Sequence, residues 1–383
     1  MNSTHCITRI QAFSYRCPIP APVETSFGRM LDRPGVFVRV EAEDGCFGWG
    51  EVFANWPAAG AEHRVNLIDR DLSQLVLGQV VGDPVRFFMS LSHKTHVRAL
   101  QSGEWGPFRQ CVAGIDIALW DMKARAAGLP LRKLLNANAP DEVPAYASGI
   151  HITQAEAEIA RAREAGFNAF KVKVGFGHEN EAQTLNALAG SLDEEETLFA
   201  DANQGFDLDQ ARTFLAGIDD SGLGWMEEPI VADAPETDWQ ALAASTRIPL
   251  AGGENIAGLV EFKRAIDQGY LKYLQPDAAK WGGVSGCFEI GKAAVAAGRI
   301  YCPHFLGGGI GIAASAELLA AVGGPGLLEV DANPNPLRSA FDLAGVDRRS
   351  GKWQLSSDPG HGCASIPNEF ESYLSHEIEC SMR

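Results

Sequence analysis

Acidic and basic side chains recur along the second half of the chain at an almost constant interval. Each follows a short apolar run, and from Lys173 onward consecutive members are 23 to 28 residues apart by subtraction of their residue numbers. The set comprises Lys171 and Lys173, then Asp201, Glu227, Glu254, Asp277, His304 and Glu329. An interval of that size accommodates one strand, one helix and two loops. Because consecutive strand ends of a (β/α)₈ barrel meet at one face, the spacing predicts that these side chains surround one cavity.

Three of the acids are candidate metal ligands. Asp201, Glu227 and Glu254 would end three consecutive strands, and three neighbouring carboxylates repel each other strongly without a cation. Carboxylate oxygens with coordination positions left open suit Mg²⁺. The chain has 49 acidic residues, so any one of them alone is most simply a surface residue, and only the shared register favours a metal site. Spacing alone leaves open whether Glu227 or its neighbour Glu228 binds the metal.

The basic residues form two candidate proton-transfer groups. Lys171 and Lys173 are two residues apart in a strand and therefore point to one face. Held near each other and near a metal, each charge lowers the pKa of the other and makes a neutral amine base accessible. Asp277 and His304 end successive strands, and a carboxylate bonded to one ring nitrogen orients an imidazole and raises its basicity. We expect this pair to be a second base, across the barrel from Lys173.

Two further polar residues have two interpretations each. Glu329 ends the eighth strand, where it would hydrogen-bond a substrate oxygen as an acid of raised pKa; a helix-capping role in the same segment is the alternative. Asn203, two residues after Asp201, would face the cavity or serve as a turn residue.

The elements that must position these residues alternate from VPAYASGI onward. Eight apolar strands separated by helical patterns predict a parallel α/β barrel. The segment before it reads as an α+β domain, because GVFVRVEAEDGCFGWGEV predicts a β-hairpin and helical spacing follows over 66–91 and 108–127. We expect a modified (β/α)₈ TIM barrel with an α+β N-terminal domain.

Composition excludes several classes of protein. The chain is 46% hydrophobic with a net charge of −17, which argues against binding nucleic acid or an anionic membrane. The sequence has no run of about 18 apolar residues, so we expect no membrane span. The N-terminal residues lack a secretory signal pattern. Eight scattered cysteines without a C-x-x-C pair are typical of reduced thiols. We therefore expect a cytoplasmic protein that acts on a small molecule.

The chain resembles the enolase superfamily, and within it the mandelate racemase and muconate lactonizing enzyme family. The resemblance spans nearly the whole chain and is carried by AGIDIALWDMKARAAGLPL, KVK, DANQ, WMEEP, GGEN and PDAAKWGG. It implies a capping domain over residues 1–135, a barrel over 136–349, and a C-terminal segment, 350–383, that packs back on the cap. It also implies one Mg²⁺ held by Asp201, Glu227 and Glu254.

The same resemblance implies roles for the remaining residues. Lys173 would be the base on one face of a carboxylate substrate, supported by Lys171, and the Asp277–His304 pair would act on the other face. Glu329 would stabilise the enolate oxygen, and His304 is typical of the mandelate racemase subgroup. By analogy we expect α-proton abstraction through an enediolate and dehydration of a hydroxylated sugar acid. The alternatives are a racemase or epimerase of a 2-hydroxy acid and, remotely, a barrel that binds a small molecule without catalysis.

The substrate itself depends on loops over 18–30 and 53–63. These loops contain the candidate contact residues Phe27, Phe53 and Trp56 and few cationic groups apart from Arg29 and Arg33. That composition suits a modest, partly apolar substrate at least as well as a long diacid. Because this architecture usually self-associates, we expect an even-numbered homo-oligomer.

Overall fold

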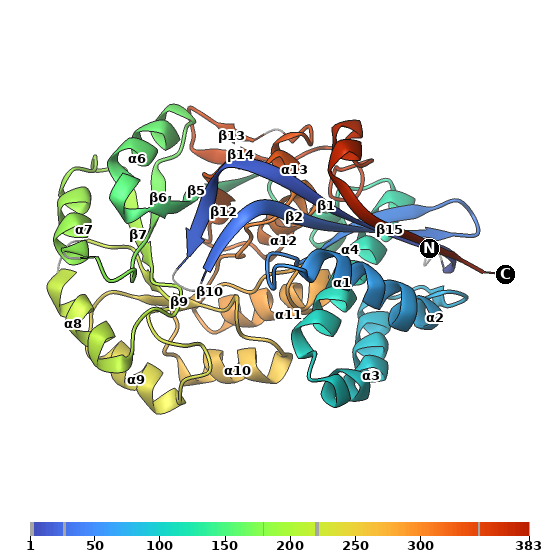
Figure 1. The fold of residues 1–383 in the computed structure, drawn as a ribbon, viewed down its shortest axis with the longest axis horizontal. Helices are drawn as coiled ribbons and strands as arrows, with labels where there is room; N and C mark the ends of the chain where they lie inside the picture. Colours follow the sequence, from blue (N-terminus) through green and yellow to red (C-terminus); the bar gives the residue numbers. More distant parts are fainter. Residues whose placement is uncertain (1–3, 26–27, 179, 219–221, 344, 383) are drawn as a thin grey trace.

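A computed structural model describes residues 4–25, 28–178, 180–218, 222–343 and 345–382. Its strands form two sheets, a five-stranded antiparallel sheet near the N-terminus and a ten-stranded sheet that contains the barrel (Figure 1). Within the described ranges, no helix has the length and apolar character needed to cross a membrane.

Eight parallel strands form the barrel, as the spacing predicts. They are β5 (Glu142–His151), β6 (Ala169–Lys173), β7 (Thr197–Asp201), β8 (Met226–Glu227), β9 (Leu250–Gly252), β10 (Tyr273–Leu274), β11 (Ile300–Tyr301) and β12 (Leu328–Asp331). Strands β5 to β11 pair in sequence order, and β12 returns to pair with β5. Where β11 and β12 lie next to each other, Gly326 approaches Tyr301 so closely that a Cβ on Gly326 would clash with the carbonyl oxygen of Tyr301.

The register of the strands aligns the predicted site residues. Lys173 pairs with Asp201, and Asp201 pairs with Glu227, so three of the regularly spaced residues stand side by side at the carboxyl ends of β6, β7 and β8. This alignment follows from parallel pairing, in which equivalent strand ends lie at one edge. The predicted (β/α)₈ architecture is confirmed.

Helices surround the barrel in the alternation that the sequence predicts. They are α6 (Ala155–Glu164), α7 (Glu181–Gly190), α8 (Leu208–Ile218), α9 (Glu236–Ala244), α10 (Leu259–Gln268), α11 (Gly283–Ala296) and α12 (Gly309–Val322). Helix α10 buries Phe262, Ala265 and Ile266 against the barrel and exposes its other face, which is the pattern of an amphipathic helix. Helix α12 is buried almost all round because it also contacts β3 of the N-terminal sheet.

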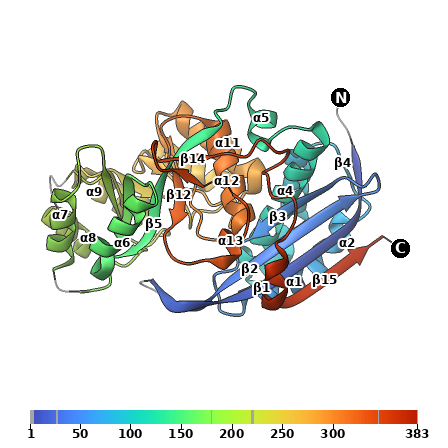
Figure 2. The same ribbon diagram turned by 90° about the horizontal axis from the view of Figure 1, so that it is seen from above.

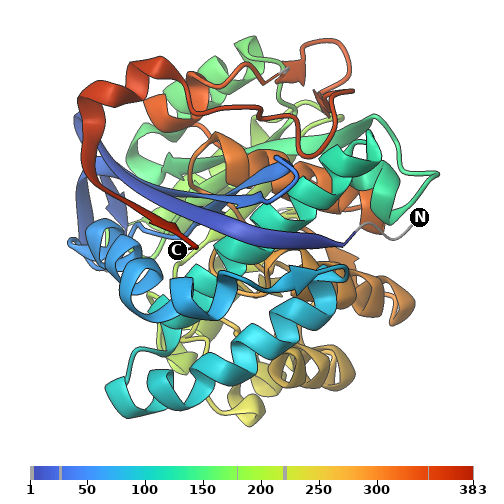
Figure 3. The same ribbon diagram turned by 90° about the vertical axis from the view of Figure 1, so that its right-hand side faces the viewer.

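The N-terminal segment packs a sheet against helices beside the barrel (Figure 3). Its elements are β1 (His5–Thr25), β2 (Gly28–Ala42), β3 (Phe47–Val52), α1 (Gly60–Leu67), a π-helical turn (Ile68–Leu72), α2 (Ser73–Val76), β4 (Val80–Val81), α3 (Pro84–Ser102), α4 (Trp105–Ala127) and α5 (Leu131–Leu135). The predicted hairpin is confirmed as β2 and β3. Gly48 and Gly50 allow α4 to lie directly on β3, because a Cβ at either would clash with the helix backbone.

One predicted helix, over residues 66–91, is wrong. The helical run stops after Val76, because Leu77 is extended and Gly78 has a positive φ. A new helix then begins at Pro84, with the Asp83 side chain accepting a hydrogen bond from Val85 N. The apolar spacing continues across this break, which is why periodicity alone misses it.

The C-terminal segment returns to the N-terminal sheet. Strand β15 (Leu374–Ser381) pairs antiparallel with β1 and lies along the edge of that sheet (Figure 2). Before it come α13 (Pro336–Ser339), a hairpin of β13 (Val346–Asp347) and β14 (Lys352–Gln354), and a 3₁₀ turn (Asn368–Tyr373). Because β14 pairs with β5, the proposed domain boundary at residue 349 falls inside a hairpin attached to the barrel. The division at 135 and 349 remains a proposal.

Candidate active site

A cavity of about 600 Å³ lies where the carboxyl ends of the barrel strands face the N-terminal segment. The barrel side contributes Lys173, Asn203, Glu254, Lys280 and His304, and the N-terminal side contributes Arg33, Phe53, Asn55, Trp56, Arg64 and Gln110. The other residues of the predicted set are buried beneath the cavity, where Asp201 bonds to Lys173 and Asp277 to His304. They are Lys171, Asp201, Glu227, Asp277 and Glu329.

The three candidate metal ligands each contact a different lysine. Asp201 Oδ2 accepts from Lys173 Nζ at 2.5 Å, and Glu254 Oε2 accepts from Lys280 Nζ at 2.9 Å. Both oxygens of Glu227 accept from Lys171 Nζ, at 2.7 and 2.8 Å. Each of the three acids therefore has an oxygen engaged by an ammonium group.

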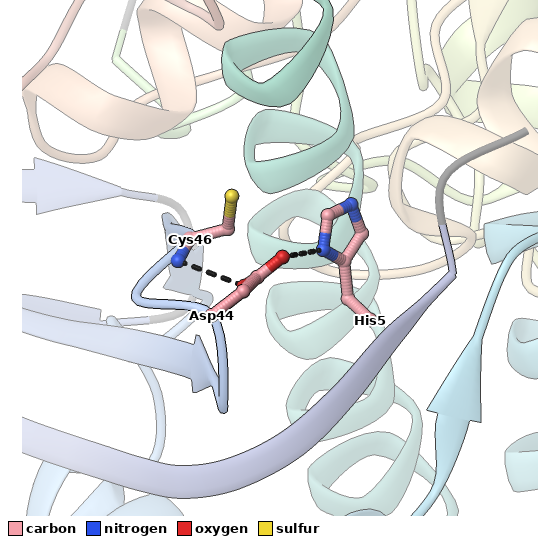
Figure 4. A group of neighbouring side chains, drawn as sticks. All are labelled: His5, Asp44 and Cys46. Atoms are coloured by element: carbon pink, nitrogen blue, oxygen red, sulfur yellow. Dashed lines mark hydrogen bonds and ion pairs between the residues drawn. The ribbon is translucent and has the colours of Figure 1, made fainter. Parts of the chain in front are cut away.

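A different group of three side chains brings its possible metal-binding atoms closest together. Over the described part of the chain, the only three His, Cys, Asp or Glu side chains with ligand atoms all within 4.8 Å of one another are His5, Asp44 and Cys46 (Figure 4). Asp44 is hydrogen-bonded to His5 Nδ1 at 2.9 Å and accepts from Cys46 N at 3.1 Å. These contacts tie the β2–β3 turn to β1, which explains the cluster as turn stabilisation.

The chemistry of the charged side chains at the strand ends nevertheless fits Mg²⁺. Six carboxyl groups meet three lysines and one histidine there, so acids outnumber bases even when the histidine is charged: Asp201, Glu227, Glu228, Glu254, Asp277 and Glu329 against Lys171, Lys173, Lys280 and His304. Burial, together with the charge of Glu254, raises the pKa of Glu228 to about 8. Among the described residues, Glu228 Oε1 and Gln275 Oε1 are buried without a hydrogen-bond partner. A hard divalent cation binds oxygen ligands and balances negative charge, so it would satisfy both the excess of carboxylates and the oxygens without a hydrogen bond.

Glu227 and Glu228 differ in the hydrogen bonds that they receive. Glu227 is surrounded by donors, because Gln275 Nε2 at 2.6 Å and Trp225 Nε1 at 3.2 Å also bond its Oε2. Glu228 lies beside Glu254 and receives one hydrogen bond, from Asn255 Nδ2 at 2.7 Å. Asp201, Glu227 and Glu254 remain the proposed ligand set, with Glu228 as the alternative to Glu227.

The predicted effect of the two lysines on each other is not realised in this arrangement. Burial lowers the pKa of Lys173 and the charge of Lys171 lowers it further, but Asp201 and Glu227 outweigh both and raise it. The pKa of Lys171 is likewise raised, against burial, by Glu227 and Glu329. These carboxylates hold the two ammonium groups, and the neutral amine base, which the prediction places beside a metal ion, stays a prediction.

The predicted Asp277–His304 pair is formed. Asp277 Oδ2 lies 2.8 Å from His304 Nδ1, and Asp277 Oδ1 accepts from the backbone nitrogens of Ala279 and Lys280. The other ring nitrogen, Nε2, lies 3.5 Å from Glu254 Oε2. Burial lowers the pKa of His304, but Glu254, Glu329 and Asp277 raise it to about 10. In this arrangement the imidazole carries a proton at neutral pH.

Glu329 differs from the expectation of an acid with a raised pKa. Its Oε1 accepts from Ser148 Oγ at 2.6 Å and pairs with Lys171 Nζ at 2.6 Å, and its Oε2 accepts from Phe305 N at 3.0 Å. Burial would raise its pKa, but Lys171 and His304 lower it to about 2. Glu329 is therefore a carboxylate that holds Lys171, and its predicted contact with a substrate oxygen stays a prediction.

The candidate substrate residues are brought together in part. Asn203 lines the cavity, has a positive φ of 43°, and accepts from Lys173 Nζ at 2.7 Å. Phe53 and Trp56 also line it, and Phe53 lies under Lys280 Nζ at 5.0 Å. Phe27 lies outside the described residues. Arg64 and Gln110 line the cavity as well, although their positions in the sequence give no sign of this.

Comparison with known proteins accounts for this architecture. Residues 8–136 match the family model for the mandelate racemase / muconate lactonizing enzyme N-terminal domain, and residues 154–366 match the model described as enolase C-terminal domain-like. The chain belongs to the mandelate racemase/muconate lactonizing enzyme family of the enolase superfamily.

Its relatives in this family include enzymes of acid sugars. D-galactarolactone cycloisomerase from Agrobacterium fabrum is 29% identical over 371 residues, which cover 93% of this chain and 95% of the relative. A mandelate racemase/muconate lactonizing enzyme from Bordetella bronchiseptica RB50 has a similar structure, with a TM-score of 0.91 and 43% identity over 97% of this chain and all of that one. L-talarate/galactarate dehydratase from Salmonella typhimurium, liganded with Mg and L-lyxarohydroxamate, has a TM-score of 0.86 and 26% identity over 99% and 95%.

Proposed function

We propose that this protein is a Mg²⁺-dependent dehydratase of a hydroxylated carboxylate, in particular a sugar acid, and forms a 2-keto acid. One observation carries the proposal. Lys173 lines the cavity from β6, and His304 lines it from the loop after β11. Strands β5 and β12 separate β6 from β11 on the shorter way round the barrel, so the two side chains enter from different sides. Each bonds its own acid, Asp201 or Asp277. Such an arrangement supplies two proton-transfer groups to different sides of one substrate.

Lys173 is the base in this proposal. With its amine neutral, Nζ takes the proton from C2, and the C–H electron pair enters the substrate carboxylate to give an enediolate. Asn203 Oδ1, 2.7 Å from Nζ, holds the amine in the cavity wall. Bound by Asp201, Glu227 and Glu254, Mg²⁺ would supply positive charge for the substrate carboxylate and offset the carboxylates that keep Lys173 protonated.

His304 is the acid. Its Nε2 donates a proton to the hydroxyl on C3, the C3–O bond breaks, and the hydroxyl leaves as water. The enol that remains takes a proton at C3 and releases the proton of its C2 hydroxyl to give the 2-keto acid, so the net change is the loss of one water molecule. Asp277 fixes the ring through Nδ1 and stabilises the charged imidazole, which is the form that can donate.

A second candidate reaction is racemisation or epimerisation of a 2-hydroxy acid. The two proton-transfer groups on different sides favour it, because His304 could return a proton to the face opposite Lys173. The relatives named for dehydration and cycloisomerisation support the acid-sugar class, since both names denote chemistry on such acids.

The test is a panel of sugar acids and 2-hydroxy acids with Mg²⁺ in D₂O, followed by ¹H NMR. Keto-acid formation supports dehydration, and deuterium at C2 with inversion and no loss of water supports epimerisation. If no acid of the panel exchanges its α-proton or forms a keto acid, the proposed function is contradicted.

A further inference from the structure

The N-terminal wall of the cavity contains an arginine without an acidic partner. Arg64, on α1, is 1% exposed and lines the cavity. Its hydrogen bonds within the described structure go to neutral oxygens: Gln110 Oε1 at 2.9 Å from Nε and 2.7 Å from Nη2, Trp56 O at 3.0 Å and Gly60 O at 3.3 Å. Glu104, the acid directly before α4, lies 2.9 Å from His63 instead.

Other buried arginines of this protein do have a carboxylate. Arg33 pairs with Asp331 at 2.7 Å, and Arg132 pairs with Glu317 at 2.6 Å. Of the three arginines that the described structure buries most fully, Arg64 alone has no ion pair within 4 Å. Burial accordingly lowers its pKa. Neutral oxygens satisfy its hydrogen bonds but do not balance its charge, so a ligand that brings negative charge would be stabilised here.

Gln110 adds a second donor to the same part of the wall. Its amide oxygen is taken by two bonds from Arg64, so its amide nitrogen points elsewhere. That nitrogen donates to no group in the described part of the protein, and Gln110 lines the cavity. A guanidinium and a free amide N–H side by side match the acceptors of a carboxylate.

We propose that Arg64 and Gln110 bind a second carboxylate at the far end of the substrate, so that the substrate is a dicarboxylic sugar acid. This inference rests on the proposed function, which places the reacting carboxylate at the barrel strand ends beside Lys173 and Glu254. Arg64 and Gln110 belong to the opposite wall of the same 600 Å³ cavity. Phe53 and Trp56 of the loop over 53–63 line the same cavity, so the apolar residues of that loop form part of its wall.

The inference is tested with pairs of six-carbon acids that differ only at C6: an aldaric acid, with a carboxylate, and the aldonic acid of the same configuration, with a hydroxymethyl group. Turnover with Mg²⁺ gives kcat/KM for each, and calorimetry gives each dissociation constant. We expect the wild type to prefer the diacid by about 10- to 150-fold, the range for hydrogen bonds to a charged group.

Two variants separate binding from folding. Arg64→Met removes the guanidinium and should abolish the preference. Gln110→Glu gives Arg64 a carboxylate of its own, so the fold gains an ion pair while the substrate carboxylate is repelled, and the preference should be lost or reversed. Gln240→Glu makes the same change on an exposed residue of α9, bonded to Gln268, and should keep the preference.

The outcomes distinguish this inference from the proposed function. Wild-type enzyme that handles aldonic and aldaric acids alike, or a Gln110→Glu variant that keeps the diacid preference, overturns the second carboxylate site and leaves α-proton abstraction standing. A diacid preference in calorimetry that depends on Arg64, without any turnover, supports the site and contradicts the proposed function.

Discussion

Replacing Asp277 by Asn should slow dehydration while leaving α-proton exchange through Lys173 close to the wild-type rate. The substitution keeps the side-chain oxygen that accepts from the backbone nitrogens of Ala279 and Lys280, at 2.8 and 3.0 Å, so the loop should keep its shape. It removes the carboxylate 2.8 Å from His304 Nδ1. The imidazole then loses the group that orients it and stabilises its charged form, so less of His304 is correctly placed and protonated to donate to the leaving hydroxyl.

The size of the effect follows from that one contact. Both groups are buried, and a hydrogen bond between charged groups contributes about 1.5–3 kcal/mol. Since about 1.36 kcal/mol corresponds to tenfold in rate, kcat for keto-acid formation should fall by roughly 10- to 150-fold. His304→Asn removes the donor itself and should lower it further.

Both reactions can be followed in one sample by ¹H NMR in D₂O with Mg²⁺ and an accepted acid. Loss of the C2 proton signal from acid that has not been dehydrated reports exchange, and the new C3 methylene or its deuterated form reports dehydration. Asp209→Asn, at an exposed position on α8, is the matched control and should leave both rates unchanged. If Asp277→Asn lowers exchange and dehydration by the same factor, or lowers neither, the assignment of His304 as the acid is refuted.

Three further results are expected. Lys173→Ala should lose α-proton exchange for one C2 configuration and retain some for the other, with the reverse in His304→Asn if the enzyme epimerises; equal residual exchange of both configurations in both variants would show that the two-face assignment is mistaken. Burial raises the pKa of Glu51 to about 8 from 4.5, against the backbone N–H groups of Gly308 and Gly311, so its contribution to stability is full below about pH 4.5 and is lost as the pH rises through about 8. Chemical unfolding between pH 5 and 9 should therefore show a fall in stability, at most about 5 kcal/mol at 1.36 kcal/mol per pKa unit, that is absent in Glu51→Gln. Light scattering at micromolar concentration should give an even-numbered homo-oligomer, and a monomer would contradict that proposal.

The barrel and the buried polar layer could be predicted because they depend on register. Parallel strands bring equivalent ends together, so the interval between Lys173, Asp201 and Glu227 already implied that they stand side by side. The Asp277–His304 pair follows from the same regularity. The helix predicted over 66–91 failed because local backbone geometry at Gly78 interrupts a continuous apolar pattern.

The electrostatic details could not be read from residue types. Whether the pKa of Lys173 rises or falls depends on which carboxylate its ammonium reaches, and that is decided by side-chain packing across three strands. The hydrogen-bond partners of Arg64 could not be predicted for a related reason. An arginine in a sequence is ordinarily solvated or paired, and only the fold shows that this one meets amide and carbonyl oxygens at a cavity wall.

The central claim is that the barrel cavity removes the α-proton of a hydroxylated carboxylate with the aid of Mg²⁺. The most direct measurement is deuterium incorporation at C2, scored together with keto-acid formation, for a sugar-acid panel in D₂O before chelation, after chelation and after Mg²⁺ is restored. We expect an accepted acid to react, the reaction to stop on chelation and to resume with Mg²⁺, and Lys173→Met to abolish exchange of the configuration that dehydrates. Full activity in the chelated enzyme, or exchange that persists unchanged in Lys173→Met, would contradict the account.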